Sequence, residues 1–220
     1  MKHNRDITPL ILSILLILGI VILAFLRHWF GIGAWVKWPV DVDLIFVGLY
    51  VVWILVEFRI AKKDAITEGK QTLDFGTCEL YALGQACTFP TALWFPSIWH
   101  APAAAHFWGI LIFLCGVLYR LWAIRTLGQF YSHRVRKVSQ HQIVNSGPYR
   151  FIRHPAYAGM IIANVGLTLY FFNWVTLAVF LIVLVPSVVL RILVEERMLF
   201  EIEGYSNFAK KRKRLIPAIW

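Results

Sequence analysis

Two clusters of basic, acidic and aromatic residues lie in the C-terminal half of the chain, about forty residues apart. The first reads Gly-Pro-Tyr-Arg-Phe-Ile-Arg-His-Pro-Ala-Tyr-Ala-Gly and occupies residues 147–159. The second reads Arg-Ile-Leu-Val-Glu-Glu-Arg and occupies residues 191–197. These residue types predict a site that binds a charged ligand, and His154 and Glu195 are the first candidates for a general base.

The first cluster has the composition of a helix start. Pro155 stands directly before an apolar run, where its missing N–H costs nothing, so His154 is the expected N-cap. A helix start presents unpaired N–H groups and the positive end of the helix dipole, which suits an anionic group such as a carboxylate. Arg150 and Arg153 would add to that attraction. The alternative is that this basic pair binds lipid head groups and fixes the topology.

The second cluster contains two adjacent carboxylates with different surroundings. Arg191 and Glu195 are four residues apart, so they can pair on one face of a helix, and a purely structural ion pair is the alternative to a ligand site. Glu196 points about 100° away from Glu195 on a helix. We therefore expect Glu196 to be the better candidate for a ligand contact.

Long apolar segments surround these clusters. The chain is 59% hydrophobic and 15% charged, whereas about a quarter of the residues are charged in a typical soluble domain. About 20 apolar residues suffice to cross the membrane as a helix. We predict an all-α polytopic membrane bundle of about six transmembrane helices, over residues 7–25, 42–60, 77–99, 103–124, 156–172 and 174–200.

The distribution of basic residues predicts the topology. With the N-terminus in the cytoplasm, only Arg27 and Lys37 of the 22 Lys and Arg residues fall on the outer side. The positive-inside rule therefore selects an N-in, C-in arrangement, and this clustering argues against reading the formal charge of +10 as a nucleic-acid site. The prolines near residues 90–102 leave open whether segment 77–99 spans fully. We divide the chain into N-terminal helices, 1–102, and a C-terminal region, 103–220, with a cytoplasmic loop at 125–155.

A tight turn at Asn173 would bring the two clusters together. At 1.5 Å per residue, the helix from His154 to Asn173 rises about 29 Å and the helix from Trp174 to Glu195 returns about 32 Å. The sequence therefore predicts a C-terminal helical hairpin that places Arg153, His154, Glu195 and Glu196 at one membrane interface.

The cysteines and the C-terminal tail suggest no further chemistry. Cys78, Cys87 and Cys115 lie in apolar segments without CxxC spacing, so we predict neither a disulfide framework nor a metal site. Residues 210–214 are five consecutive basic residues, which favours a solvated or lipid-binding face. The apolar ending of the chain predicts that the tail packs back onto the protein or onto the membrane interface.

At the two clusters the sequence resembles the isoprenylcysteine carboxyl methyltransferase family, which is related to the phospholipid N-methyltransferases. The shared pattern is Gly-Pro-Tyr-Arg, then Arg-His-Pro-x-Tyr-x-Gly, then a Glu-Glu pair with a following Tyr and a basic-Leu-Ile-Pro ending. This chain meets the later part of the pattern with Glu195, Glu196, Tyr205 and residues 214–217. The resemblance extends over about residues 105–220.

The resemblance implies an integral membrane methyltransferase that uses S-adenosylmethionine. It implies cofactor contacts at Tyr149, Arg153, His154, Tyr157, Glu195 and Glu196, and catalytic roles for Glu195 and His154. The active site would face the cytoplasm, in the cell membrane of a prokaryote or the endoplasmic reticulum of a eukaryote.

The methyl acceptor is open within this interpretation. We expect a lipophilic or lipidated acceptor, and carboxyl O-methylation of an isoprenylcysteine-like molecule is the first choice. Phospholipid amines, quinone precursors, alkylpyrones and small thiols also remain. Two other functions compete: an NADPH-dependent sterol-reductase-like enzyme, although Met160 replaces the acidic residue expected after Gly159, and a non-catalytic membrane subunit or transporter.

Overall fold

The structure is a computed structural model that describes residues 8–30, 40–66, 76–99, 104–131, 143–217 and 219–220. Within these residues the chain is helical, with one isolated parallel β-bridge between Ile152 and Lys213. Its long helices are α1 (Thr8–Phe30), α2 (Val40–Ile66), α3 (Thr77–Trp94), α4 (Ala104–Leu127) and α5 (Pro155–Tyr170). A continuous last helix follows, made of α6 (Trp174–Val179), the π-helical turn η3 (Phe180–Leu184) and α7 (Val185–Leu199). The all-α prediction is confirmed, and each of the six apolar segments is helical.

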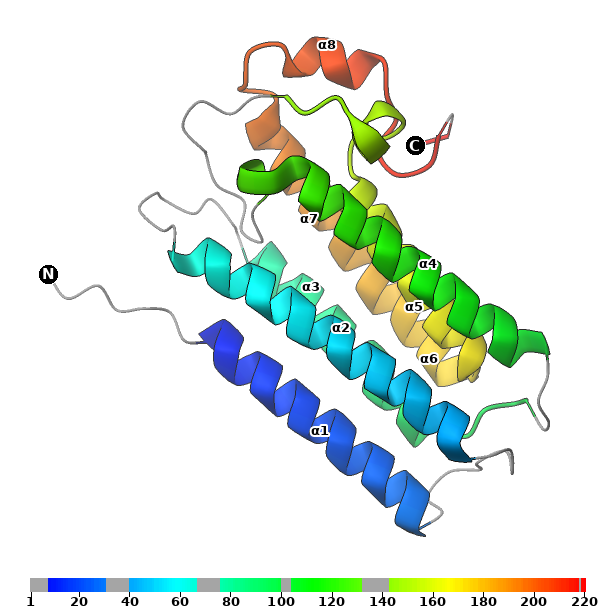
Figure 1. Ribbon diagram of the computed structural model, residues 1–220. Coiled ribbons are helices and arrows are strands. Elements are labelled where there is room, and N and C mark those ends of the chain that lie inside the picture. The colour runs from blue at the N-terminus through cyan, green and yellow to red at the C-terminus, as the bar shows by residue number, and fades with distance from the viewer. Residues whose placement is uncertain (1–7, 31–39, 67–75, 100–103, 132–142, 218) are drawn as a thin grey trace, which may run out of the picture.

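The long helices run side by side as an elongated bundle (Figure 1), and the short helix α8 (Tyr205–Lys210) lies across one end. Two short 3-10 turns, η1 (Gly128–Phe130) and η2 (Gly147–Arg150), lie at the same end. Two stretches of the described chain, Ala104–Phe130 and Trp174–Leu199, are long and apolar enough to cross a membrane. The count of six spans and the N-in, C-in orientation stay predictions.

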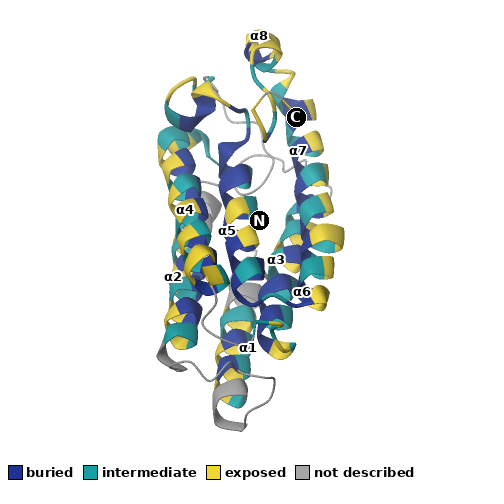
Figure 2. Ribbon diagram, turned by 90° about the vertical axis from the view of Figure 1, so that its right-hand side faces the viewer, coloured by how far each residue is buried: buried dark blue, intermediate teal, exposed yellow. Residues whose placement is uncertain are grey.

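Helix α5 is the central helix of the C-terminal part, and most of its residues are buried (Figure 2). It packs against α4 along a seam where Gly109 and Gly116 of α4 face Gly166 and Gly159 of α5. A Cβ added to Gly159 would lie 2.6 Å from the backbone nitrogen of Arg120, so no side chain fits there. Small residues of this kind let two membrane helices approach until their backbones touch.

The predicted hairpin is present at Asn173. Helix α5 ends at Tyr170, and the Asn173 side chain caps α6 by accepting a 2.8 Å hydrogen bond from the backbone N–H of Thr176. The same side chain donates to the Phe171 carbonyl at 3.1 Å, which fixes the turn. Because an N-cap side chain satisfies an otherwise unpaired helix donor, asparagine is well suited to restart the helix here.

Helix α3 runs alongside this hairpin. It ends at Trp94, five residues before the predicted end, because Phe95 is extended and precedes Pro96, which disfavours a helical residue before it. The following residues continue to the hairpin turn, where the Ile98 N–H donates to the Phe172 carbonyl at 2.8 Å. At the other end of α3, Thr77 accepts a 3.3 Å hydrogen bond from Arg191 of α7. This segment therefore extends from the level of Arg191 to the turn of the hairpin.

An aromatic core joins the N-terminal helices to the C-terminal hairpin. Phe46 of α2 packs on Tyr170 of α5 with ring centroids 4.6 Å apart, and Tyr50 of α2 stacks on Phe89 of α3 at 3.9 Å. Phe113 of α4 completes the cluster, 4.8 Å from Phe46. These contacts place α2 and α3 against the helices that carry both polar clusters. The boundary at residues 102–103 stays a prediction.

Candidate functional site

The two polar clusters meet at a buried carboxylate. Glu196 is 3% exposed, and its Oε1 lies 3.1 Å from His154 Nε2 and 3.1 Å from Arg153 Nη1. Its Oε2 accepts a 2.7 Å hydrogen bond from Arg214 Nε of the C-terminal tail. The hairpin thus brings together residues 42 positions apart, as predicted. Because each carboxylate oxygen already has a charged or polar partner, Glu196 holds three chain segments in one arrangement.

The C-terminal tail forms the outer wall of this site. Residues 213–214 run parallel to residues 152–154, and the N–H groups of Arg153 and His154 donate to the carbonyls of Lys213 and Arg214 at 2.9 and 3.0 Å. Leu215 of this tail is buried, so the tail packs back onto the protein, one of the two predicted outcomes, while Ile216 and Ile219 are exposed. The basic stretch is divided in function: Arg214 bonds Glu196, while the side chain of Lys213 is exposed.

His154 is the N-cap residue of α5 and Pro155 its first residue, as predicted. The His154 side chain does not cap the helix but turns to Glu196. Because the tail carbonyls accept the N–H groups of Arg153 and His154, these two backbone donors are not open to a ligand.

The second carboxylate, Glu195, has a different partner. Its Oε2 accepts a 2.8 Å hydrogen bond from the Tyr157 hydroxyl, and this hydroxyl accepts one from Arg191 Nε at 2.9 Å. Arg191 and Glu195 are thus linked through Tyr157, and not only along one helix face as the i, i+4 spacing suggested. Glu195 is half-buried, whereas Glu196 is buried, so Glu195 is the more accessible of the two carboxylates.

Two buried donors of this site have no hydrogen-bond partner among the described residues: Nε of Arg153 and the hydroxyl of Tyr205. Buried polar atoms are seldom left unpaired, since each costs about 1–3 kcal/mol. Tyr149, also buried, lies near Glu195, and burial raises its pKa above the ordinary range, with the Glu195 charge adding to the shift. Its phenol therefore stays protonated at neutral pH.

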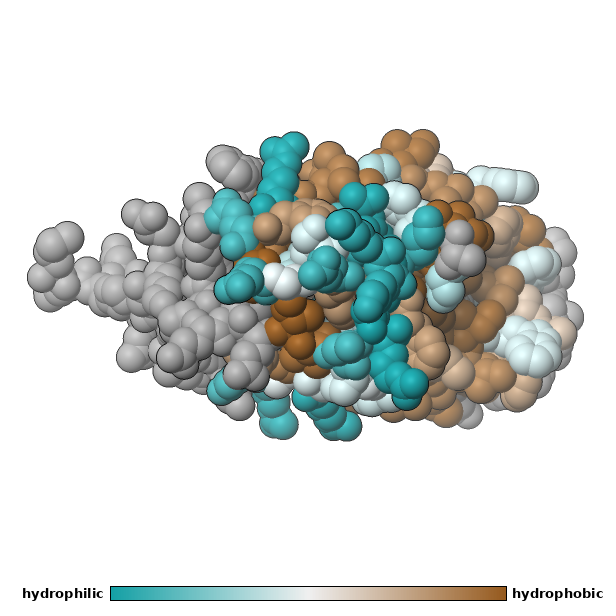
Figure 3. Space-filling model, turned by 90° about the horizontal axis from the view of Figure 1, so that it is seen from above, coloured by the Kyte–Doolittle hydropathy of each residue, from teal (hydrophilic) through white to brown (hydrophobic). Residues whose placement is uncertain are grey.

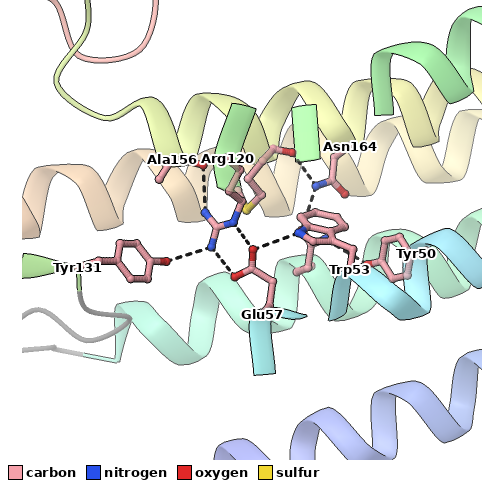
Figure 4. A network of polar contacts seen from close by, with 9 residues as sticks. Tyr50, Trp53, Glu57, Arg120, Tyr131, Ala156 and Asn164 are labelled. Atoms are coloured by element: carbon pink, nitrogen blue, oxygen red, sulfur yellow. Dashed lines mark hydrogen bonds and ion pairs between the residues drawn. The ribbon is translucent and has the colours of Figure 1, made fainter. Parts of the chain in front are cut away.

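A buried ion pair that the sequence interpretation missed lies next to the first turn of α5 (Figure 4). Arg120 of α4, 1% exposed, donates from Nε and Nη2 to Glu57 of α2 at 2.5 and 2.8 Å. Its Nη1 donates to the carbonyl of Ala156, in the first turn of α5, at 3.0 Å, and its Nη2 to the Tyr131 hydroxyl at 3.2 Å. The available signal was a charged residue of opposite sign within each of two apolar segments, since such residues persist mostly when they are paired or functional.

All the predicted site residues lie at one end of the bundle. His154, Arg153 and Glu196 are in direct contact, Tyr157 contacts Glu195, and Tyr149 is buried in the adjoining turn η2. Figure 3 looks onto this end and shows hydrophilic residues gathered in a band across it, with apolar residues around them. Their functional roles stay predictions.

Comparisons with known proteins place this arrangement in context. Residues 109–201 match the model of the isoprenylcysteine carboxyl methyltransferase (ICMT) family. The chain is 29% identical over 122 residues to protein-S-isoprenylcysteine O-methyltransferase B of Arabidopsis thaliana, which covers 52% of this chain and 62% of the relative. It is 36% identical over 107 residues to protein-S-isoprenylcysteine O-methyltransferase of Saccharomyces cerevisiae, covering 48% of this chain and 45% of the relative. The matches thus span less than two thirds of these relatives' length.

A solved structure supports the fold over a longer region. The structure of the eukaryotic intramembrane Ras methyltransferase ICMT superimposes with a TM-score of 0.58 and 21% identity, over 91% of this chain and 73% of that one. The neighbour is a membrane protein, in agreement with the apolar helices found here. These findings favour the methyltransferase interpretation over the reductase and scaffold alternatives. The resemblance first drawn from two polar clusters is thereby confirmed, and it is to the isoprenylcysteine carboxyl methyltransferase family.

Proposed function

We propose that this chain is an integral membrane methyltransferase that transfers a methyl group from S-adenosylmethionine to a lipophilic acceptor. The observation that carries the proposal is the 3.1 Å contact between His154 and Glu196, which joins the two segments of the family pattern into one site. The family match supports the reaction class, and the polar end of the bundle supports a charged cofactor.

The residues at the site fit the cofactor's charges. S-adenosylmethionine carries a cationic ammonium and sulfonium and one carboxylate, and when bound it supplies a methyl group that is open to nucleophilic attack. Glu195 offers a half-buried carboxylate for a cationic group. Arg153 offers a buried donor, Nε, without a partner among the described residues, which suits an anionic group. Tyr149, Tyr157, His154 and Glu196 would complete the cofactor site.

The residues of this chain act in the reaction mainly by alignment. An acceptor carboxylate is already ionised, so it can displace the thioether leaving group without a general base, and the protein holds the two groups in line and excludes water. For a phenol, enol or amine acceptor, Glu195 is the first candidate to remove the proton, since it is the more accessible carboxylate. His154 is the second, because its Nε2 is engaged by Glu196.

The preferred acceptor is an isoprenylcysteine-like molecule with a free carboxyl group. The named relatives are protein-S-isoprenylcysteine O-methyltransferases, and an ionised carboxylate requires the least from the catalytic residues. We further propose that the site faces the cytoplasm, in an N-in, C-in topology of six spans. Under this topology the polar cofactor reaches the site from water while the acceptor's lipid chain stays in the bilayer.

The test is cofactor binding by the purified, full-length protein. Titration calorimetry should show saturable binding of S-adenosylmethionine to the wild type. The substitutions Glu196→Gln and His154→Ala should weaken binding at least tenfold, since each removes a contact that fixes the site. Glu203→Gln, an exposed acid seven residues beyond Glu196, is the matched control and should bind as the wild type. Absence of saturable binding to the wild type would refute the proposal.

The acceptor is tested by radiolabelled S-adenosylmethionine with membranes that contain the protein. A prenylated cysteine with a free carboxyl group should acquire label that mild base releases as methanol, because a methyl ester hydrolyses and an N-methyl group does not. The same molecule supplied as its methyl ester should acquire none. Label found only in base-stable products would exclude carboxyl methylation.

A further inference from the structure

We propose that the Tyr205 hydroxyl and Nε of Arg153 form a donor pair that binds the carboxylate of the cofactor's methionine moiety. This inference rests on the proposed function and adds Tyr205 to the site as a cofactor-contacting residue. Tyr205 belongs to the sequence pattern, but the pattern alone gives it no role.

The first step is the position of Tyr205. It begins α8, the helix that covers the polar end of the bundle, and it is 5% exposed. Its ring packs edge-on against Phe200 at 5.2 Å and beside Phe208 at 5.7 Å between ring centroids. Aromatic contacts of this kind hold the ring in one orientation. The hydroxyl is therefore presented in a fixed position, although within the described residues it bonds to nothing.

The second step is the charge around this hydroxyl. The pKa of Tyr205 is raised by burial first and then by the negative charge of Glu196, while the positive charge of Arg153 lowers it. The phenol thus lies within the electrostatic reach of both residues and stays protonated, so it is a donor. A buried O–H without an acceptor is destabilising, and a ligand oxygen that accepts its hydrogen bond would remove that cost.

The third step is the geometry of Arg153. Its side chain is 9% exposed, and the guanidinium bonds Glu196 through Nη1. This contact fixes the guanidinium plane and leaves Nε buried without a partner in the described part of the chain. Arginine can donate to a carboxylate through two parallel N–H groups, and it cannot accept a hydrogen bond. The ligand atom that faces it must therefore be an acceptor, and an anionic one is favoured.

The choice between two carboxylates follows from location. Tyr205 begins α8, and the backbone N–H of Arg153 donates to the tail, so both residues adjoin the cap formed by α8 and the tail. This cap lies at the hydrophilic end of the bundle (Figure 3). A polar cofactor reaches this cap from water, whereas the carboxyl group of a lipid-tailed acceptor is tethered to a chain in the bilayer. We therefore assign the donor pair to the carboxylate of the cofactor.

The experiment compares S-adenosylmethionine with its decarboxylated analogue, which lacks only the carboxylate. Calorimetry on the full-length wild type and on Tyr205→Phe gives four dissociation constants. Loss of the hydroxyl should weaken S-adenosylmethionine about tenfold, which corresponds to 1.4 kcal/mol, and should change the analogue by less than twofold. Tyr119→Phe, a half-buried tyrosine on α4, is the matched control and should change neither.

The variant should remain folded, because the hydroxyl that it removes has no partner to lose. An unchanged or higher melting temperature together with weaker binding marks a ligand contact, since a structural hydroxyl would reduce both. If Tyr205→Phe lowers the melting temperature, Arg153→Lys serves as the second variant. It keeps the positive charge but loses the planar set of N–H donors, so it should also weaken binding of S-adenosylmethionine more than binding of the decarboxylated analogue.

Three outcomes overturn the inference while leaving the proposed function intact. The first is an equal loss of affinity for S-adenosylmethionine and for the decarboxylated analogue, and the second is an unchanged affinity for S-adenosylmethionine. The third is a higher KM for the acceptor alone, which would assign the donor pair to the acceptor's carboxylate. Failure of the wild type to bind either ligand would refute the proposed function itself.

Discussion

The two residues of the ion pair between Glu57 and Arg120 should contribute differently: loss of Glu57 should reduce the stability of the protein more, and loss of Arg120 should reduce cofactor affinity more. The Arg120 side chain is 2% exposed and that of Glu57 is 18% exposed. Replacing Glu57 with Leu leaves a buried guanidinium whose remaining partners among the described residues are the Ala156 carbonyl and the Tyr131 hydroxyl. Uncompensated buried charges cost about 3–5 kcal/mol. For a chain of this length, this corresponds to a fall in melting temperature on the order of 10 °C.

Replacing Arg120 with Met should cost less. The remaining carboxylate keeps a 3.1 Å hydrogen bond from Trp53 and some access to solvent. The double variant, Glu57→Leu with Arg120→Met, should be more stable than Glu57→Leu alone, because an apolar pair can replace a buried ion pair at little cost.

Cofactor affinity should fall more in Arg120→Met than in Glu57→Leu, the opposite of the order expected for stability. Arg120 donates to the Ala156 carbonyl, two residues after His154, so Arg120→Met loosens the helix start that carries the site. Glu57→Leu keeps that bond and should retain affinity at temperatures where it is folded. Thermal unfolding in detergent and calorimetry with S-adenosylmethionine measure the two effects. If the single losses of stability simply add in the double variant, the pair is not coupled and the reasoning is wrong.

Three further predictions concern packing, the tail and pH. Gly116→Ala should destabilise the protein by about 1–3 kcal/mol, because its Cβ would strike the α5 backbone, while Gly48→Ala, with open space around it, should not; thermal unfolding compares them. Arg214→Ala should weaken cofactor binding severalfold by freeing Glu196 Oε2, and Lys213→Ala, its exposed neighbour, should bind normally in the same titration. Because burial raises the pKa of Tyr149 above 10.0, the unfolded chain ionises first and stability falls as pH rises past about 10. Tyr149→Phe should reduce that fall in melting temperature, and an identical pH profile would contradict the assignment.

The positions of the helices were largely predictable because a helix that crosses a membrane requires a long apolar segment, which can be recognised in the sequence. The proximity of His154 and Glu196 was also predictable, since a turn at Asn173 and a fixed rise per residue return both residues to one depth. The exact helix ends were less so: Pro96 terminates α3 earlier than hydropathy indicates, because hydropathy does not report backbone restriction.

The partners of the charged residues could not be predicted from the hairpin alone. Arg214 reaches Glu196 only because the tail runs parallel to residues 152–154, and a consecutive basic stretch carries no sign of which side chain turns inward. Glu57 of α2 and Arg120 of α4 are 63 residues apart in sequence, so their pairing depends on how α2 packs against α4. Spacing within one helix indicates an i, i+4 contact but not a tertiary one, as the link from Arg191 through Tyr157 to Glu195 demonstrates.

The glycine seam between α4 and α5 limits how a lipid can approach. A hydrocarbon chain is several ångströms wide, yet at Gly109, Gly116, Gly159 and Gly166 there is no space even for one added methyl group. A prenyl or acyl tail therefore cannot pass between α4 and α5 at these glycines. Lateral access from the bilayer must therefore lie away from this seam, and photoreactive lipid-tailed acceptors should not label the residues that line it.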